Sequence, residues 1–207
     1  MEKLLEGIIK FKQNDFEKHK SLFKELKYSQ NPHTLFIGCS DSRVVPNLIT
    51  QTSPGELFVV RNIANRIPRY RKNRKYSESA SAMEYAVNKL NVPNIIICGH
   101  SHCGGCKVLF SPKGVFKSKS RAKKSLGLGY HQNSRVLKEE PEDEYNHPER
   151  LIEQINVVEQ MENLLTYPFI KVKYEEQSLV ISGWYYICET GEVFIYNKES
   201  RYFELGN

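Results

Sequence analysis

The chain contains Thr34-Leu-Phe-Ile-Gly-Cys39-Ser-Asp41-Ser-Arg43, in which a short apolar run leads into a thiol, a carboxyl group and a guanidinium group. A second stretch has the same form, Asn94-Ile-Ile-Ile-Cys-Gly-His100-Ser-His-Cys103-Gly-Gly-Cys106. Short apolar runs of this kind are typical of buried strands. Open α/β sheets place their sites just past the carboxyl ends of such strands. We therefore predict an α/β fold with a mainly parallel sheet flanked by helices, and a functional site where these two strands end.

The side chains at these strand ends match the ligands of a catalytic zinc ion. Zinc prefers nitrogen and sulfur ligands in tetrahedral geometry, and a catalytic site uses three protein ligands so that water can take the fourth position. Cys39, His100 and Cys103 supply three such ligands. His100 and Cys103 can both turn inward from one loop, whereas Cys39 must come from a neighbouring strand. We predict one Zn²⁺ per chain, bound by these three residues.

Two other interpretations of the cysteines stay open at this point. Cys103 and Cys106 have the C-x-x-C spacing of thioredoxin-like redox motifs. That hypothesis leaves His100 and the 39–43 stretch without a role. A structural zinc site usually has four protein ligands, and Cys106 would have to be the fourth. The carboxyl and guanidinium groups of the 39–43 stretch argue against a closed structural site.

At these residues the chain resembles the β-class carbonic anhydrases, whose Cys-x-Asp-x-Arg and His-x-x-Cys segments are separated by a similar stretch. The resemblance extends to the segments 54–65, 84–86, 183–186 and 189–192. It therefore covers most of residues 30–106 and 179–196. It implies a lyase that catalyses the reversible hydration of carbon dioxide to bicarbonate and a proton, with zinc-bound hydroxide as the nucleophile.

The resemblance implies catalytic roles for Asp41 and Arg43. Asp41 would orient the zinc-bound hydroxide by accepting its hydrogen bond, or would bind the metal as a fourth ligand. The planar fork of Arg43 can hold a carboxylate through two hydrogen bonds, which would keep Asp41 ionised and off the zinc. Because two thiolates cancel the formal charge of the ion, bound water should ionise less readily than it does beside neutral ligands. We expect activity to increase on the alkaline side of neutrality.

The resemblance also implies a substrate pocket of the plant-like subtype. In that pocket an amide hydrogen-bonds carbon dioxide or bicarbonate, and apolar side chains exclude water. The matching residues are Gln30, Phe58, Ile63, Tyr85 and Gly104. The alternative for the three large apolar members is a plain core position. The allosteric bacterial subtype has Trp three residues before the first Cys ligand, where this chain has Phe36. We therefore expect the non-allosteric subtype, although Arg61 and Tyr186 of the allosteric anion site are present.

Length and composition set further limits. A chain of 207 residues, 40% of them hydrophobic, predicts a single domain over 1–207 with a sizeable core. No apolar run approaches the roughly 18 residues of a membrane span, and we expect no signal peptide. Five cysteines, of which at least two are needed as thiolates, favour the cytoplasm.

The net charge of +6 comes largely from two runs of basic residues, at 66–75 and 113–124. Neither run has the pattern of a nucleic-acid-binding fold. We expect a small-molecule substrate, no nucleic acid and no membrane partner.

Helical and turn patterns predict the remaining organisation. Residues 2–26 repeat apolar side chains at helical period, which predicts an amphipathic helical arm over 1–28. The resemblance implies that such an arm lies across a partner subunit, in a homodimer or homotetramer. A second helical pattern at 151–165 would cover the sheet. A turn at 189–191 between two apolar runs predicts an antiparallel edge pair. Residues 111–148 are polar and are expected to form a variable surface loop.

Overall fold

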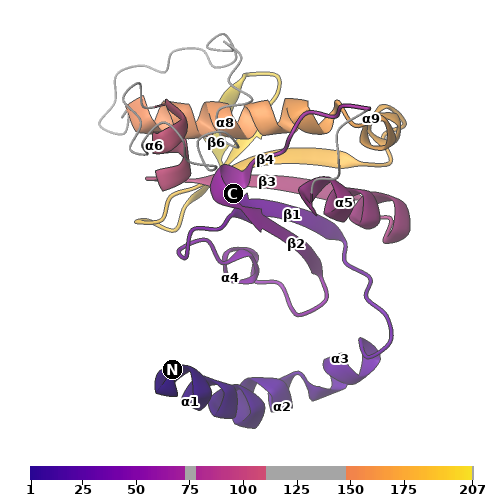
Figure 1. Ribbon diagram of the computed structural model, residues 1–207, viewed down its shortest axis with the longest axis vertical. Helices are drawn as coiled ribbons and strands as arrows, with labels where there is room; N and C mark the ends of the chain where they lie inside the picture. Colours follow the sequence, from indigo (N-terminus) through magenta and orange to yellow (C-terminus); the bar gives the residue numbers. More distant parts are fainter. Residues whose placement is uncertain (73–77, 111–147, 207) are drawn as a thin grey trace.

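The computed structural model describes residues 1–72, 78–110 and 148–206. Within these residues the chain forms a six-stranded sheet of order β2-β1-β3-β4-β5-β6. The strands are β1 (Thr34–Cys39), β2 (Leu57–Asn62), β3 (Asn94–His100), β4 (Val180–Tyr186), β5 (Val193–Asn197) and β6 (Tyr202–Leu205). The first four strands in this order run parallel, and the last two pairings are antiparallel. The predicted mainly parallel sheet with an antiparallel edge is therefore confirmed (Figure 1).

The register brings the carboxyl ends of the central strands together. Gly38 in β1 pairs with Cys98 in β3, and His100 at the end of β3 pairs with Tyr186 at the end of β4. All six residues of β1 are buried, as expected for the continuous apolar run of an interior parallel strand. Cys39 and His100 are the last residues of their strands. They therefore leave the sheet at the same edge.

Helices pack on the sheet and complete the core. In the described part of the chain the longest is α8 (Pro148–Leu164), which packs on β3 and β4. The others are α4 (Pro46–Thr50), η2 (Ile63–Asn65), α5 (Glu78–Glu84), η3 (Tyr85–Lys89), α6 (Gly104–Phe110) and α9 (Pro168–Glu175). Apolar residues of α5, η3, α8 and α9 form one buried cluster with alternate residues of the strands, among them Leu35, Ile37, Ile95, Ile97 and Ile181. This alternation is the period of two that places one strand face against a helix layer.

The predicted amino-terminal arm is helical. It consists of α1 (Glu2–Lys10), η1 (Phe11–Asp15), α2 (Phe16–Lys18) and α3 (Lys20–Glu25). None of its residues is buried. The arm lies apart from the sheet and is joined to β1 by an extended segment (Figure 1). Its first helix and the following turn expose large apolar side chains, namely Leu4, Leu5, Ile8, Ile9 and Phe11.

One predicted segment falls almost entirely on residues that the structure does not describe. The predicted loop at 111–148 lies outside the described residues, apart from Pro148, which begins α8. None of the helices in the described ranges has the length and hydropathy that a bilayer crossing needs.

Candidate metal centre

Three side chains meet at the carboxyl edge of the sheet. Cys39 ends β1, His100 ends β3, and Cys103 lies directly before α6. The ligand atoms of these residues all lie within 4.8 Å of one another, and the two sulfur atoms are 3.9 Å apart. Each residue is at most 4% exposed. The structure thus brings together the three side chains that the sequence predicted as zinc ligands.

The imidazole of His100 is arranged as a metal ligand would be. Its Nδ1 lies 2.9 Å from the carbonyl oxygen of Ser101, which can only accept, so Nδ1 carries the proton. Its Nε2 is buried and has no hydrogen-bond partner within the described residues. Ligating histidines commonly donate the second N–H to a backbone carbonyl in this way. The free lone pair of Nε2 is therefore left for a cation.

The two thiols complete a donor set that fits zinc. The neighbouring Cys103 thiol and burial raise the pKa of Cys39 to about 12. A hydrogen bond with Cys106, together with burial, raises the pKa of Cys103 to about 12. Both thiols are thus protonated at neutral pH until a cation displaces their protons. Two sulfurs and one nitrogen suit zinc, whereas calcium and magnesium prefer oxygen ligands.

Asp41 and Arg43 form a two-pronged ion pair beside the cluster. Arg43 donates from Nε to Asp41 Oδ1 and from Nη2 to Asp41 Oδ2, each at 2.9 Å. These hydrogen bonds hold the pKa of the Asp41 carboxyl well below its usual range. Arg43 Nη2 also donates to the carbonyl oxygen of His102 at 3.1 Å. Asp41 Oδ2 lies 3.9 Å from His100 Nε2, so the ionised carboxylate faces the metal position while Arg43 holds it.

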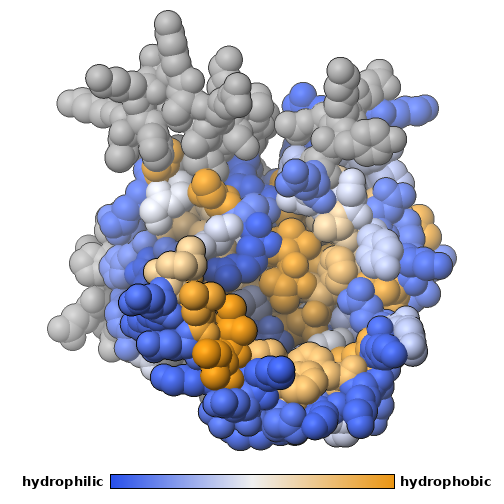
Figure 2. Space-filling view, turned by 60° about the horizontal axis from the view of Figure 1, so that its bottom comes forward, coloured by the Kyte–Doolittle hydropathy of each residue, from blue (hydrophilic) through white to orange (hydrophobic). Residues whose placement is uncertain are grey.

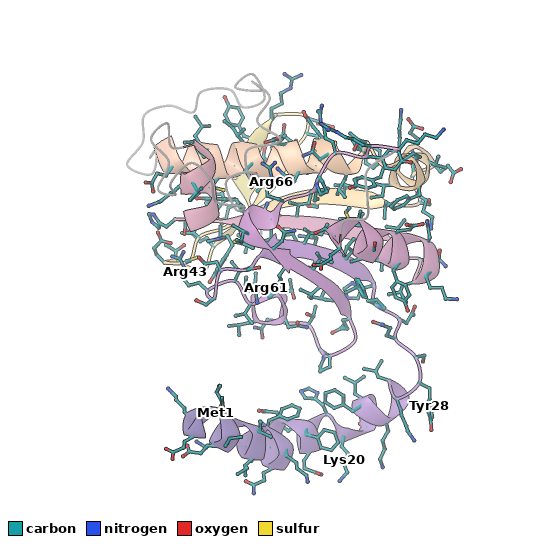
Figure 3. The ribbon with its side chains drawn as sticks, in the orientation of Figure 1. Met1, Lys20, Tyr28, Arg43, Arg61 and Arg66 are labelled. Carbon is teal, nitrogen blue, oxygen red and sulfur yellow. The ribbon has the colours of Figure 1, made fainter. Side chains whose placement is uncertain are left out.

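Arg61 holds the turn that follows β1. Its Nε donates to the carbonyl oxygen of Cys39 at 3.0 Å, and its Nη2 donates to that of Asp41 at 2.7 Å. Arg43 and Arg61 lie near α4, at the carboxyl side of the sheet (Figure 3). The family resemblance relates Arg61 only to the allosteric anion site. In the structure its guanidinium group is hydrogen-bonded to the backbone of the turn that follows Cys39.

The second ligand loop is held by acidic side chains. Ser101 Oγ donates to Glu189 Oε2 at 2.6 Å, and His102 Nε2 lies 2.8 Å from Glu189 Oε1. The backbone N–H of Cys103 donates to Glu153 Oε1 at 2.6 Å. The sequence alone does not predict a role for Ser101, Glu153 or Glu189. Glu189 could have been suspected, because it stands in one of the segments that carry the family resemblance.

Two of the predicted pocket residues lie beside the ligand loop. Gly104 directly follows Cys103 and begins α6, and Ile63 begins η2. A Cβ atom at Gly105 would lie 2.8 Å from Ile63 Cγ2, so the absence of a side chain lets α6 pack closely against η2. Ile63 is 52% exposed, which leaves an apolar surface next to the cluster.

The other three pocket residues lie apart from the ligands in one copy of the chain. Phe58 pairs with Leu35, four positions before Cys39 in β1. The ring of Phe58 contacts that of Tyr85, with centroids 5.9 Å apart. Gln30 precedes β1 and is exposed. These three residues therefore lie toward the amino ends of the strands, and their pocket role stays a prediction.

Comparisons with known proteins match most of the chain to carbonic anhydrases. A family model described as carbonic anhydrase matches residues 34–193. A carbonic anhydrase of Helicobacter pylori is 41% identical over 207 residues, which cover 96% of this chain and 91% of that protein. The solved β-carbonic anhydrase CcaA is 37% identical with a TM-score of 0.84, and the match covers 100% of this chain and 99% of that one. A structure of tetrameric β-carbonic anhydrases from Sordaria macrospora is 26% identical with a TM-score of 0.75, over 94% of this chain and 95% of that one.

Proposed function

This chain belongs to the β-class carbonic anhydrases, and on that premise we propose that it hydrates carbon dioxide reversibly at a zinc ion held by Cys39, His100 and Cys103. The observation that carries the proposal is the buried cluster of these ligands, in which His100 Nε2 has no hydrogen-bond partner among the described residues. The family uses zinc, and the donor set fits it.

Each residue around the cluster has a definite task in this reaction. Cys39, His100 and Cys103 would hold the zinc ion, which would lower the pKa of a bound water and so supply the nucleophile for carbon dioxide. Asp41 accepts the hydrogen bond that orients this nucleophile. Arg43 keeps the Asp41 carboxylate ionised and directed by two hydrogen bonds, which prevents it from becoming a fourth ligand. Ser101 fixes the imidazole of His100 through its carbonyl oxygen. The exposed apolar side chain of Ile63 limits access of competing water.

We expect the hydration rate to rise between pH 6 and pH 9. Cys39 and Cys103 bring two negative charges to the cation, so the nucleophile forms less readily than beside neutral ligands. Asp41 is not the titrating group in this range, because Arg43 holds the pKa of its carboxyl well below the usual range. The measurement is the initial rate of carbon dioxide hydration by zinc-loaded protein at constant ionic strength. A hydration rate that stays constant between pH 6 and pH 9 would contradict a site with two thiolate ligands.

We also propose that the enzyme acts as a homodimer or homotetramer. In one copy, Gln30, Phe58 and Tyr85 lie apart from the ligands, so a second copy is needed to supply them to a site. The arm exposes large apolar side chains, namely Leu4, Leu5, Ile8, Ile9 and Phe11. Apolar side chains also gather around a hollow on one face of the molecule (Figure 2). Exposed apolar surfaces of this kind mark interaction sites.

The mass in solution tests this assembly. One copy has a mass of 24.1 kDa, and we expect light scattering to give a multiple of that value. Replacing both Leu4 and Ile8 with serine should lower the mass, because it removes apolar contact from α1. The matched control replaces Lys10 and Lys12 with serine on the same arm and should leave the mass unchanged. A wild-type mass of a single copy would contradict the proposal.

The proposed location is the cytoplasm. All five cysteines lie in the described ranges, and none forms a disulfide. Two of them are needed as metal-binding thiolates, which a reducing compartment preserves.

A further inference from the structure

Helix α8 directs several polar side chains into the protein interior. Five of its polar residues are at most 3% exposed: Glu153, Gln154, Asn156, Gln160 and Asn163. Burying a polar group costs free energy unless the group is hydrogen-bonded. The partners of these side chains therefore show what the helix holds in place.

Three of these side chains hold the segment that follows β2. Asn156 Nδ2 donates to the carbonyl oxygen of Ala64 at 3.0 Å. Gln160 Oε1 accepts the N–H of Ile67 at 2.8 Å, and Asn163 Nδ2 donates to the carbonyl oxygen of Ile67 at 3.0 Å. All three are amides bonded to the backbone of one loop. None of these bonds reaches a metal ligand.

Glu153 differs from these three amides, because it carries a carboxyl group and is hydrogen-bonded to a metal-ligand residue. Its Oε1 accepts the backbone N–H of Cys103 at 2.6 Å, and its Oε2 accepts the hydroxyl of Tyr185 at 2.7 Å. Glu153 is only 2% exposed, and Tyr185 is 1% exposed. A buried carboxyl group thus links α8, strand β4 and one of the three ligands of the metal centre.

We propose that Glu153 is a positioning residue of the metal centre, which holds the backbone of Cys103 so that its thiol points toward Cys39 and His100. This inference rests on the proposed function of that cluster. Tyr185 in turn holds the carboxyl group of Glu153 from β4. The direction of the Cys103 thiol is therefore set by helix α8 and strand β4 as well as by its own loop.

The ligand loop needs such support because its backbone is strained. His102, directly before Cys103, has a φ of 53°, in the left-handed region that costs energy for residues other than glycine. Ser101 on one side of this position is fixed by Glu189. Cys103 on the other side is fixed by Glu153. Both flanks of the strained residue are thus bonded to acidic side chains.

The identity of the side chain matters as well as its position. A glutamine can accept a hydrogen bond at only one of its two terminal atoms, because the other is a donor. The carboxyl group of Glu153 accepts at both oxygens, from the N–H of Cys103 and from the hydroxyl of Tyr185. Glu153→Gln therefore keeps the volume of the side chain and weakens its hold on Cys103.

The test compares metal binding by full-length variants. Glu153→Gln is expected to lower the affinity for Zn²⁺ by about 10- to 100-fold, measured by competition with a chelator. It is also expected to shift the absorption bands of the Co²⁺-substituted protein, which report the geometry of the thiolate ligands. Tyr185→Phe leaves the bond to Cys103 in place, so it should change both quantities in the same direction by a smaller amount.

The matched control is Gln160→Met, which removes an equally buried polar group of α8 that holds Ile67. It should lower thermal stability while the Zn²⁺ affinity and the Co²⁺ spectrum stay as in the wild type. A wild-type affinity and spectrum for Glu153→Gln would overturn the inference, even if stability fell. Equal losses of affinity in Gln160→Met would also overturn it, because they would show a general loss of stability. Failure of the wild type to bind Zn²⁺ would instead contradict the proposed function.

Discussion

Arg43→Ala is expected to lower the rate of carbon dioxide hydration by about 10- to 100-fold. Its zinc content should stay as in the wild type. Arg43 binds both carboxylate oxygens of Asp41, and its guanidinium group is the first cause of the low pKa of that carboxyl. Without it, the carboxylate is free to turn toward the metal, since Asp41 Oδ2 is already 3.9 Å from His100 Nε2. The variant then loses the acceptor that orients the nucleophile.

Zinc content and initial rates, measured on the same samples, separate this effect from a loss of metal. The matched control is Arg71→Ala, which removes the same charge from an exposed position and should be as active as the wild type. Full activity in Arg43→Ala would remove Arg43 from the mechanism. Loss of zinc would show that it supports the ligands instead.

Cys103→Ser is expected to lose both zinc and activity, whereas Cys106→Ser keeps both. The sulfur of Cys103 lies in the ligand cluster, 3.9 Å from that of Cys39. A serine hydroxyl does not replace a thiolate as a zinc ligand. Cys106 is just as buried, at 2% exposed, but is not part of the cluster. The pair of variants therefore replaces a sulfur atom with oxygen at a ligand directly before α6 and at a buried neighbour within α6.

The same pair distinguishes zinc catalysis from redox chemistry at the C-x-x-C spacing. A dithiol–disulfide reaction needs both Cys103 and Cys106, so each serine variant would abolish it. Zinc content after dialysis and the hydration rate are measured for both variants. Loss of zinc in Cys106→Ser would contradict the proposed ligand set, and loss of activity with its zinc retained would give Cys106 a part in the reaction.

The sheet and the ligand cluster could be predicted because their signals are local. Each of β1 and β3 is a continuous apolar run that ends at a candidate ligand, and few metals share the preference of zinc for sulfur and nitrogen. The antiparallel pairing of β4 with β5 followed from the turn between them. Strand β6 was not predicted, because it has four residues and only Phe203 among them is buried. Such a segment is too short to show the alternation of apolar and polar residues that identifies a strand.

The residues that support the ligands could not be predicted, because their contacts depend on the tertiary structure. Arg61 and Glu153 bond to backbone atoms of the ligand loops, and a backbone partner leaves no pattern in the sequence. An acid within an amphipathic helix is normally a solvated residue. Glu153 is buried because a hydroxyl and an N–H meet it from β4 and from the Cys103 loop.

Stopped-flow hydration of carbon dioxide by the zinc-loaded wild type at pH 8.5 tests the central claim most directly. The Cys103→Ser variant, prepared in the same way, serves as the blank. We predict hydration well above this blank from protein that contains one zinc per chain. Wild-type protein with its zinc in place and no hydration above the blank would contradict the account.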